Sequence, residues 1–344
     1  GYSVYAALTA IRALEDAGIP HPRAVGLIET REESGSNDLE HYLKKNAARF
    51  GSPRLVCVLD SGAGNYEQLW LTSSLRGACA IDLNVRVLRQ GMHSGTASGV
   101  VPSSFDVLRI LLDRIQDPRT GAILDPAFNV EIPSNRMDDL KKTAEVLGDG
   151  FISEFPWAEG PNGSVQSRCR GTEEALIARC WKPTLSVTGA AGLPPLSMAG
   201  NSLRSDTTLR LSFRLPPTAK TENILPALQK KLLTDPPFNA VVSIAGGDAL
   251  PGWNAPSEAD WFRSACDESS KALWGKPAMR IGEGGSIPIL NLFEAQFPRA
   301  QFAVTGVLGP GSNAHNADES LDLAYTEKFI AAVGYLAASI PEEA

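Results

Sequence analysis

The sequence lacks the features of several protein classes. No apolar run in its 344 residues approaches the roughly 20 residues of a membrane span, so we expect no contact with a membrane. It has no basic cluster and a net charge of −7, so the sequence predicts no positively charged surface that would bind DNA or RNA. Its five cysteines form no CxxC pair, which predicts unpaired, mostly buried thiols in a reducing, cytoplasmic compartment. It has no GxSxG motif, which disfavours a serine hydrolase.

The length of the chain predicts two domains, because one hydrophobic core rarely serves 344 residues. Apolar residues recur at helical spacing over residues 3–17, and no strand pattern precedes them. Gly1-Tyr2-Ser3 is neither a start methionine nor a signal peptide. We therefore expect the sequence to begin in the middle of a domain.

The first 75 residues are predicted to alternate between helices and strands, as in an α/β fold. The helix at 3–17 precedes a predicted strand at 24–28, a polar helix at about 37–49 and a continuous apolar run at 55–59. Apolar runs of that length are typical of strands buried on both faces of a parallel sheet. The same style returns near the C-terminus, with a helix predicted at 257–273, a strand at 301–305 and a helix at 325–338.

The middle of the chain has a different style. Residues 79–88 and 207–214 alternate between apolar and polar side chains, as strands with one wet face do. Helical patterns at 103–115 and 221–233 and a strand pattern at 240–245 accompany them. This combination predicts an α+β unit with an antiparallel sheet.

We therefore predict two domains. An α/β domain with a mostly parallel mixed sheet comprises residues 1–75 and 247–344. The α+β unit of residues 76–246 is inserted into it, because the α/β style resumes after the unit ends.

Two adjacent carboxylates, Glu32 and Glu33, follow the predicted strand at 24–28 and precede a turn-forming stretch. On a tight turn, adjacent side chains can diverge around one small site. One carboxylate can then hold a metal while the other moves a proton. The alternative is a solvated charge pair on a loop, as most such pairs are.

Asp60 and His315 occupy comparable positions. Asp60 ends the second predicted strand, and His315 lies in the loop after the last one. Ligands of open α/β sheets bind outside the carboxyl ends of the strands, so we expect Glu33, Asp60 and His315 to converge on one crevice. Mixed carboxylate and imidazole ligands suit Zn²⁺, or Mn²⁺ and Co²⁺, and Glu32 would then be the general base. Alternatively, Asp60 forms a turn and His315 is an exposed loop residue.

The predicted insertion holds two more candidates. His93, in a Gly/Ser-rich loop, either is satisfied by the backbone or stabilises an oxyanion. Arg214, at the end of an alternating strand, either is solvated or pairs bidentately with a substrate carboxylate, through two N–H donors of its guanidinium. The other two histidines, His21 and His41, have the surroundings of surface residues.

Several motifs now fall into one pattern: Glu32-Glu33-Ser34-Gly35-Ser36, Asp60, Leu75-Arg76-Gly77, His93-Ser94-Gly95, Arg214-Leu215, Glu283-Gly284-Gly285-Ser286-Ile287-Pro288 and Asn313-Ala314-His315. In order and approximate spacing they resemble the M20 metallopeptidases. The nearest branch is the one that holds cytosolic nonspecific dipeptidase and carnosinase. The resemblance runs over essentially the whole chain, and several motifs together are far more specific than any one of them.

The resemblance implies a zinc-peptidase-like catalytic domain and an inserted lid domain through which two copies form a homodimer. It also implies two divalent metal ions, Zn²⁺ first and Mn²⁺ or Co²⁺ as alternatives. By motif, Glu32 is similar to the general base, whereas Glu33, Asp60 and His315 are similar to metal ligands.

The remaining matched residues are similar to groups that bind the substrate. His93 matches the lid histidine that reaches the partner subunit's active site and stabilises the oxyanion. Asn201 and Arg214 match lid positions that contact the substrate. Ser286 matches a catalytic-domain position near the substrate's C-terminal carboxylate.

The sequence departs from the family pattern at its beginning. The family's His-x-Asp motif and its metal-bridging Asp lie upstream of the position matched by Gly1. We therefore expect the N-terminal part of the catalytic domain to be absent from this sequence, the ligand set to be incomplete and this segment alone to be inactive.

The leading hypothesis is a metal-dependent hydrolase that cleaves dipeptides or C-terminal residues, with Glu32 as the general base. A first alternative is an amidohydrolase of the same family that deacylates N-acyl amino acids. A second is a non-catalytic dimeric binding protein with the same fold. The sequence separates the two hydrolases poorly, because both need the same metal cradle.

Overall fold

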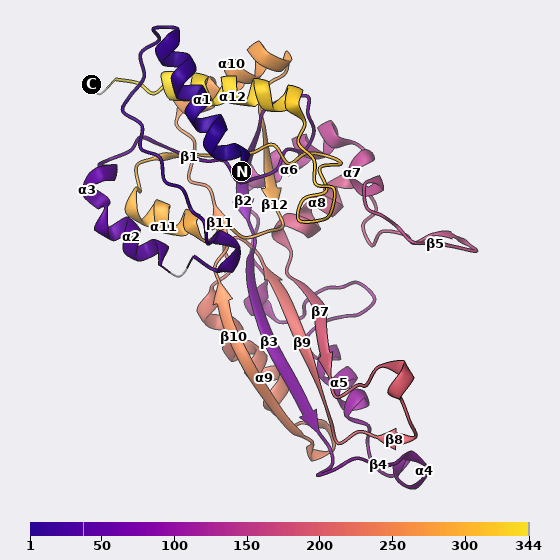
Figure 1. Cartoon of the computed structure of the whole chain (residues 1–344). Helices are drawn as coiled ribbons and strands as arrows, with labels where there is room; N and C mark the ends of the chain where they lie inside the picture. Colours follow the sequence, from indigo (N-terminus) through magenta and orange to yellow (C-terminus); the bar gives the residue numbers. More distant parts are fainter. Residues whose placement is uncertain (37, 343–344) are drawn as a thin grey trace.

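The computed structural model describes residues 1–36 and 38–342, apart from the side chain of Glu33. It is elongated, with a mixed α/β body at the top and a long antiparallel sheet below it (Figure 1). We call these parts the upper body and the lower sheet. None of the described helices has both the length and the apolarity to cross a membrane.

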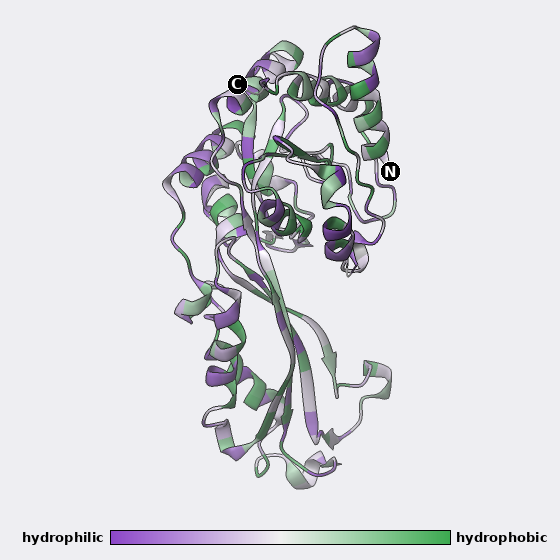
Figure 2. Ribbon diagram, turned by 90° about the vertical axis from the view of Figure 1, so that its left-hand side faces the viewer, coloured by the Kyte–Doolittle hydropathy of each residue, from purple (hydrophilic) through white to green (hydrophobic). Residues whose placement is uncertain are grey.

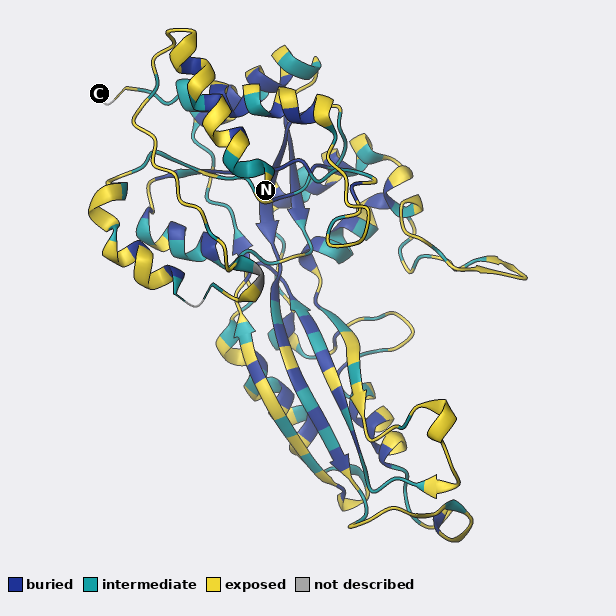
Figure 3. Cartoon of the chain, viewed as in Figure 1, coloured by how far each residue is buried: buried dark blue, intermediate teal, exposed yellow. Residues whose placement is uncertain are grey.

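The lower sheet has four antiparallel strands in the order β10 (Val241–Leu250), β3 (Gly77–Arg86), β9 (Asp206–Leu215) and β7 (Thr184–Ala191). Buried residues alternate with less buried ones along β3 and β9, because successive side chains point to opposite faces. The alternation is visible in hydropathy (Figure 2) and in burial (Figure 3). Helices α5 (Ser104–Asp113) and α9 (Ile224–Leu233) pack on the apolar face.

The lower sheet confirms the antiparallel α+β pattern predicted for the middle of the chain. The sequence patterns missed the edge strand β7 and the helices α6 (Ser134–Leu147) and α8 (Thr172–Trp181). Both helices pack against the upper body: the hydroxyl of Thr143 on α6, for example, donates a hydrogen bond to the carbonyl of Arg280 at 2.8 Å. The exact division into domains stays a prediction, and β10 continues beyond the predicted boundary at residue 246.

The upper body holds the mostly parallel strands. β1 (Leu55–Val58) pairs in parallel with β13 (Gln301–Val304), and β2 (Trp70–Leu75) pairs in parallel with β12 (Met279–Glu283) and antiparallel with β11 (Trp253–Asn254). Every residue of β2 is buried (Figure 3). The hydroxyl of Thr305, just after β13, donates to the carbonyl of Trp70 at 2.6 Å and so joins the two groups of strands. The predicted mixed, mostly parallel sheet is thus confirmed.

Helices cover these strands on two sides. Helices α1 (Tyr2–Asp16), α10 (Asp260–Trp274) and α12 (Leu323–Ala338) lie together at the top, and α2 (Leu39–Lys45), α3 (Ala47–Phe50) and α11 (Ile289–Gln296) lie beside β1 (Figure 1). The carboxylate of Asp322 accepts the backbone N–H of Tyr325 at 2.7 Å and caps the start of α12.

The remaining elements are short: η1 (Glu32–Ser34), β4 (Met92–His93), α4 (Ser94–Ala97), η2 (Pro126–Phe128), α7 (Gly150–Ser153), β5 (Glu159–Gly160), β6 (Gly163–Ser164), η3 (Leu196–Met198), β8 (Ser202–Leu203), η4 (Thr221–Asn223) and η5 (Pro237–Asn239).

Two predictions for the upper body were wrong. Residues 24–28 form no strand, because no described strand lies alongside to supply ladder hydrogen bonds. Ile28 is 65% exposed as a result. The apolar run at 55–59 does form a parallel strand, β1, but this strand is only partly buried and its Cys57 is exposed. Among the described strands, β13 alone pairs with β1, so one edge of β1 has no neighbouring strand there. Cys79, Cys180 and Cys266 are buried as predicted.

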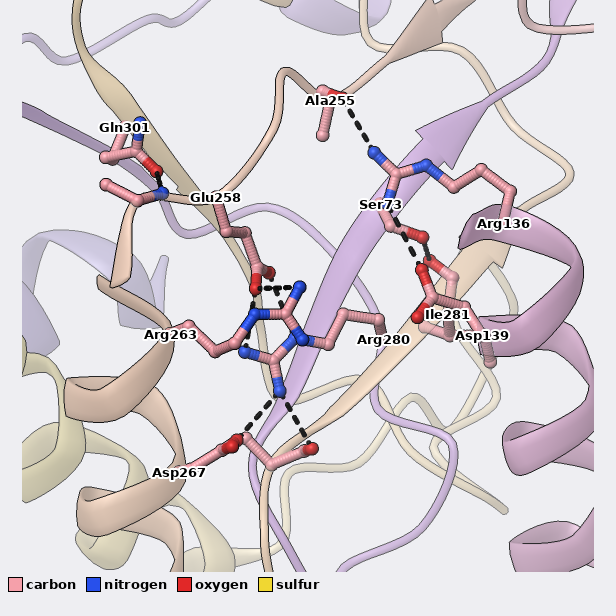
Figure 4. Close-up of polar contacts among 12 residues, drawn as sticks. Ser73, Arg136, Asp139, Ala255, Glu258, Arg263, Asp267, Arg280, Ile281 and Gln301 are labelled. Carbon is pink, nitrogen blue, oxygen red and sulfur yellow. Dashed lines mark hydrogen bonds and ion pairs between the residues drawn. The ribbon is translucent and has the colours of Figure 1, made fainter. Parts of the chain in front are cut away.

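A buried network of charges holds α10 and α6 to the sheet (Figure 4). The Arg280 guanidinium on β12 donates to Glu258 at 2.9 and 3.1 Å and to Asp267 at 2.8 Å. Nearby, Arg136 on α6 donates to the side chain of Asn254 at 2.8 Å and to the carbonyl of Ala255 at 2.6 Å. Both arginines are buried, and buried charges persist only when they are paired or hydrogen-bonded in this way.

Glycine at position 306 is required where the ends of β1 and β13 meet. A Cβ added to Gly306 would lie 1.8 Å from the carbonyl oxygen of Ser61. We expect Gly306→Ala to lower the free energy of unfolding by about 2–4 kcal/mol, because the backbone itself must move. Gly26→Ala is the matched control, since an added Cβ there meets nothing within 4 Å. Urea denaturation measures both variants, and equal midpoints would contradict the close approach.

Candidate active site

The carboxyl ends of β1 and β13 lie side by side. Beyond the paired strands, Ser61 donates its N–H to the carbonyl of Thr305 at 3.2 Å, and Ala63 donates to Leu308 at 2.9 Å. Asp60 is therefore fixed at this edge of the sheet, where its side chain is exposed. The hydroxyl of Tyr2 donates to the carbonyl of Leu59 at 3.0 Å and brings the start of α1 to the same place.

The electrostatics of Tyr2 agree with this arrangement. Burial raises the pKa of the Tyr2 hydroxyl, and the negative charge of Asp60 raises it further. The backbone at Val307, just past β13, acts in the opposite direction through a hydrogen bond. Asp60, the start of α1 and the end of β13 thus surround one point.

His315 lies on the loop that follows β13. Its backbone has a φ of 61°, and Asn313 and Asp318 in the same loop also have positive φ values of 55° and 61°. Such left-handed conformations are uncommon outside glycine, and they often occur in loops at functional sites. The N–H of His315 donates to the Glu319 carboxylate at 3.1 Å, which helps to hold this conformation.

Glu32 begins the short helical turn η1 and does not follow a strand as predicted. Its side chain is half-buried. Gly35 ends the turn in the left-handed region with a φ of 95°, and the Ser34 hydroxyl donates to the carbonyl of Arg31 at 3.1 Å. The side chain of Glu33, the third predicted metal ligand, lies outside the described residues.

The donor chemistry fits a divalent cation, because carboxylates and imidazole are the groups that zinc and manganese prefer. The paired ends of β1 and β13 put Asp60 and the loop of His315 at one edge of the sheet. Within residues 1–36 and 38–342, and without the Glu33 side chain, no three His, Cys, Asp or Glu residues are grouped closely enough to hold a metal. The predicted convergence of three ligands therefore stays a prediction.

The end of β12 borders the same region. The carboxylate of Glu283 pairs with Arg179 and lies so close to Gly62 that a Cβ there would be 3.2 Å from it. The loop that follows carries Ser286, whose hydroxyl donates to the carbonyl of Arg76. Three strand ends, from β1, β13 and β12, thus border one edge of the upper body.

Arg214 lies on β9, near the place where the upper body meets the lower sheet, which we call the junction. It pairs across the sheet with Ala78 on β3 and with Thr184 on β7. Its positive charge is close enough to Arg76 to lower the pKa of that residue. The predicted substrate residues Arg214 and Ser286 therefore both lie near Arg76.

His93 and Asn201 meet at the far tip of the lower sheet. His93 pairs with Ser202 in the short β4–β8 ladder, and Ser94 donates its N–H to the carbonyl of Asn201 at 2.9 Å. Both residues are exposed. Figure 1 shows β4 and β8 at the opposite end of the molecule from β1, so within one chain they are remote from Asp60.

The geometry of His93 assigns its proton. The backbone N–H of Gly95 donates to Nδ1 of His93 at 3.1 Å. An acceptor Nδ1 carries no proton, so in the neutral ring the proton is on Nε2. His93 thus presents a hydrogen-bond donor to the solvent at the tip.

Sequence reasoning missed Arg179, and it gave Arg76 and Glu283 no individual role. Arg76 is only 9% exposed. Nothing in its local sequence predicts this burial, because it is a charged residue in the short connection between β2 and β3. A single sequence does not reveal that this arginine is buried, because its partners lie on segments more than 100 residues later.

Comparison with curated proteins finds metallodipeptidases, although no family model matches. The chain is 26% identical over 327 residues to Cys-Gly metallodipeptidase dug1 of Schizosaccharomyces pombe, which covers 92% of this chain and 66% of that protein. It is 24% identical over 323 residues to cysteinylglycine-S-conjugate dipeptidase of Corynebacterium striatum, with the same two coverages. The chain thus spans just under two thirds of the length of these relatives.

Solved structures share the fold over nearly the whole chain. Human carnosine dipeptidase 1 matches with a TM-score of 0.74 at 20% identity and covers 98% of this chain and 70% of its own. The dipeptidase Dug1p of Saccharomyces cerevisiae gives a TM-score of 0.75 at 22% identity, with coverages of 98% and 71%. The M20 family metallo-carboxypeptidase Sso-CP2 of Sulfolobus solfataricus gives 0.73 at 21% identity, with coverages of 98% and 75%.

Proposed function

We propose that the chain is a homologue of the M20 metallopeptidases, in the branch of the Cys-Gly dipeptidases and carnosinase, and that it carries active-site residues of a metal-dependent dipeptidase or carboxypeptidase. The observation that carries the proposal is the parallel pairing of β1 with β13. It puts Asp60 and the loop of His315 at the sheet edge that β12 also reaches. Substrates bind at such edges in open α/β folds.

Glu33, Asp60 and His315 are the residues that would hold the metal, with zinc as the first choice and manganese or cobalt as alternatives. A divalent ion bound by these residues would supply Lewis-acid chemistry: it would polarise the scissile carbonyl and lower the pKa of a water molecule. Glu32, half-buried on its turn, accepts the proton of that water and delivers it to the leaving amine.

His93 of a second copy would stabilise the developing oxyanion. Within one chain it is remote from Asp60, so a donor at the tip can reach a site only in another molecule. The proton on Nε2 is the one to be donated, because Nδ1 accepts from Gly95. Large exposed apolar side chains near the tip support a homodimer through this region: Val100 is 83%, Leu196 95% and Met198 75% exposed.

The free carboxylate of the substrate would bind between Arg214 and Ser286, with Asn201 as a further substrate contact. Arg214 offers a fork of donors that fits a carboxylate. Anchoring of a free terminus favours removal of terminal residues over cleavage inside a long peptide.

Removal of the base tests the role of Glu32. We expect Glu32→Ala in the full-length protein to lower kcat by about 10²–10⁴-fold, the usual value of a general base, with metal content unchanged. Glu40→Ala is the control, because Glu40 is an exposed carboxylate on nearby α2 that pairs with Lys44. Turnover with dipeptides and metal analysis by mass spectrometry are the measurements. Wild-type turnover in Glu32→Ala would contradict the assignment of Glu32 as the general base.

Mixing of subunits tests the shared site. Glu32→Ala and His93→Ala are each expected to be inactive, but a mixed dimer contains one site with both residues intact. After the two variants are unfolded and refolded together in equal amounts, about half of the dimers should be mixed, each with one intact site of its two. We therefore expect about a quarter of the wild-type activity, as for sites completed across a symmetric interface. Activity that stays at the level of the separate variants would argue against a site shared between copies.

A substrate panel separates the peptidase from the deacylase. We expect dipeptides with a free amino group to be hydrolysed with a kcat/KM at least about tenfold above that of N-acetyl amino acids, a difference of about 1.4 kcal/mol in transition-state binding. Both substrate types carry the same free carboxylate and differ at the other end. A preference for the N-acetyl compounds would favour the amidohydrolase. Binding of either substrate without turnover, in a protein that holds no metal, would favour a non-catalytic binding protein.

A further inference from the structure

Arg76 lies where the chain passes from the upper body to the lower sheet. It is the single residue between β2 and β3, and it is 9% exposed. Its backbone and side chain both bind the loop after β12. The N–H of Arg76 donates to the carbonyl of Glu283 at 3.3 Å, and its Nε donates to the carbonyl of Gly284 at 3.2 Å. Its own carbonyl accepts the hydroxyl of Ser286.

The other end of the guanidinium reaches the lower sheet. Nη1 of Arg76 donates to the carbonyl of Lys182 and to the hydroxyl of Thr184, both at 3.4 Å. Thr184 is the cross-strand partner of Arg214. One side chain therefore joins the loop of Ser286 to the strand pair that carries Arg214.

Gly284 is enclosed by two arginines. A Cβ added there would lie 3.1 Å from Nη2 of Arg76 and 3.4 Å from Cγ of Arg179. Arg179 in turn pairs with the Glu283 carboxylate. The loop is thus clamped from two sides, by Arg76 at its backbone and by Arg179 at its acidic side chain.

The cluster carries more positive than negative charge. Arg76, Arg179 and Arg214 lie near one another, and Glu283 pairs with only one of them. In the described part of the chain, neither Arg76 nor Arg214 makes an ion pair with a carboxylate. Burial is the main reason why the pKa of Arg76 is lowered to about 10. Cys180 acts in the opposite direction, and the charges of Arg214 and Arg179 lower the pKa further. An anion bound here would relieve this repulsion.

We propose that Arg76 is a positioning residue, which locks the loop of Ser286 beside Arg214 so that the junction selects substrates with a free carboxylate. The inference rests on the proposed function and deepens it. Arg76 acts through the loop and through its uncompensated charge, while Ser286 and Arg214 face the substrate.

The test compares a dipeptide with its C-terminal amide in the full-length protein. Arg76→Lys keeps the charge but loses the planar fork, and it should lower the acid-over-amide preference in kcat/KM by about tenfold, as loss of about one charge-assisted hydrogen bond does. The change should appear in the KM of the acid, with kcat nearly unchanged. Thr184→Val removes one acceptor of the same guanidinium at a half-buried strand position and should shift the preference in the same direction.

Arg136→Lys is the matched control. Arg136 is also buried and also donates to a backbone carbonyl, but it lies in the separate network of Figure 4. It should lower stability and leave the acid-over-amide preference at the wild-type value. An unchanged preference in Arg76→Lys, or an equal loss for acid and amide, would overturn the proposal.

Amide hydrogen exchange tests the positioning role of Arg76 without any measurement of turnover. Amides of residues 284–286 should exchange faster in Arg76→Lys than in the wild type or in Arg136→Lys. Wild-type exchange of this loop in Arg76→Lys would refute the clamp. If the wild-type protein hydrolyses neither substrate, the proposed function fails, whereas the exchange experiment still gives its answer on Arg76.

Discussion

The parallel pairing of β1 with β13 is the constraint on which the candidate site depends. These strands are separated by more than 240 residues in the sequence, and their register, with Val58 opposite Val304, continues into the loops through the bonds of Ser61 and Ala63. Parallel strands end at the same edge, so every residue that follows them is delivered to one region. The contact at Gly306 leaves no room for a side chain, which makes this edge sensitive to small changes.

A second constraint is the way in which the two parts of the molecule are connected. The chain leaves the upper body from β2 into β3 and returns from β10 into β11, and these two crossings touch. A Cβ at Gly77 would lie 2.4 Å from the carbonyl oxygen of Leu250, and one at Gly252 would lie 2.7 Å from that of Leu75. The crossings are therefore packed backbone against backbone. Because Arg76 lies directly beside this contact, its bonds join the sheet edge of the upper body to the strands of the lower sheet.

Alternating patterns predicted the lower sheet well, because one of its faces is packed and the other is wet. The strand patterns at 79–88 and 207–214 correspond to β3 and β9 within a few residues. The sequence failed for β2, which is wholly buried but contains Thr72, Ser73 and Ser74. Their polarity hides the strand in a single sequence, and only the fold shows partners such as the carbonyl of Ile281, 3.3 Å from the Ser73 hydroxyl.

The opposite error occurred at residues 24–28. An apolar run is compatible with a strand, but a strand exists only where a neighbour supplies hydrogen bonds, and no described segment does so here. Glu32 was consequently predicted at a strand end and lies instead on the short turn η1. The strands that precede Asp60 and the loop of His315 do pair, as a site at the strand ends requires, and the roles of these two residues stay a prediction. The role of Arg76 could not be read from the sequence, because it arises from burial and from partners on distant segments.

The balance of charge differs between the surroundings of two buried arginines, Arg280 and Arg76. In the network of Figure 4, Arg280 is matched by Glu258 and Asp267, and although burial opposes it, their hydrogen bonds and charges raise the pKa of Arg280. At Arg76 the pKa is lowered instead, with burial as the main cause. Two buried arginines a short distance apart along the sheet thus have opposite shifts. The first has its counter-charges within the fold, whereas the second donates only to neutral carbonyl and hydroxyl oxygens among its described hydrogen bonds.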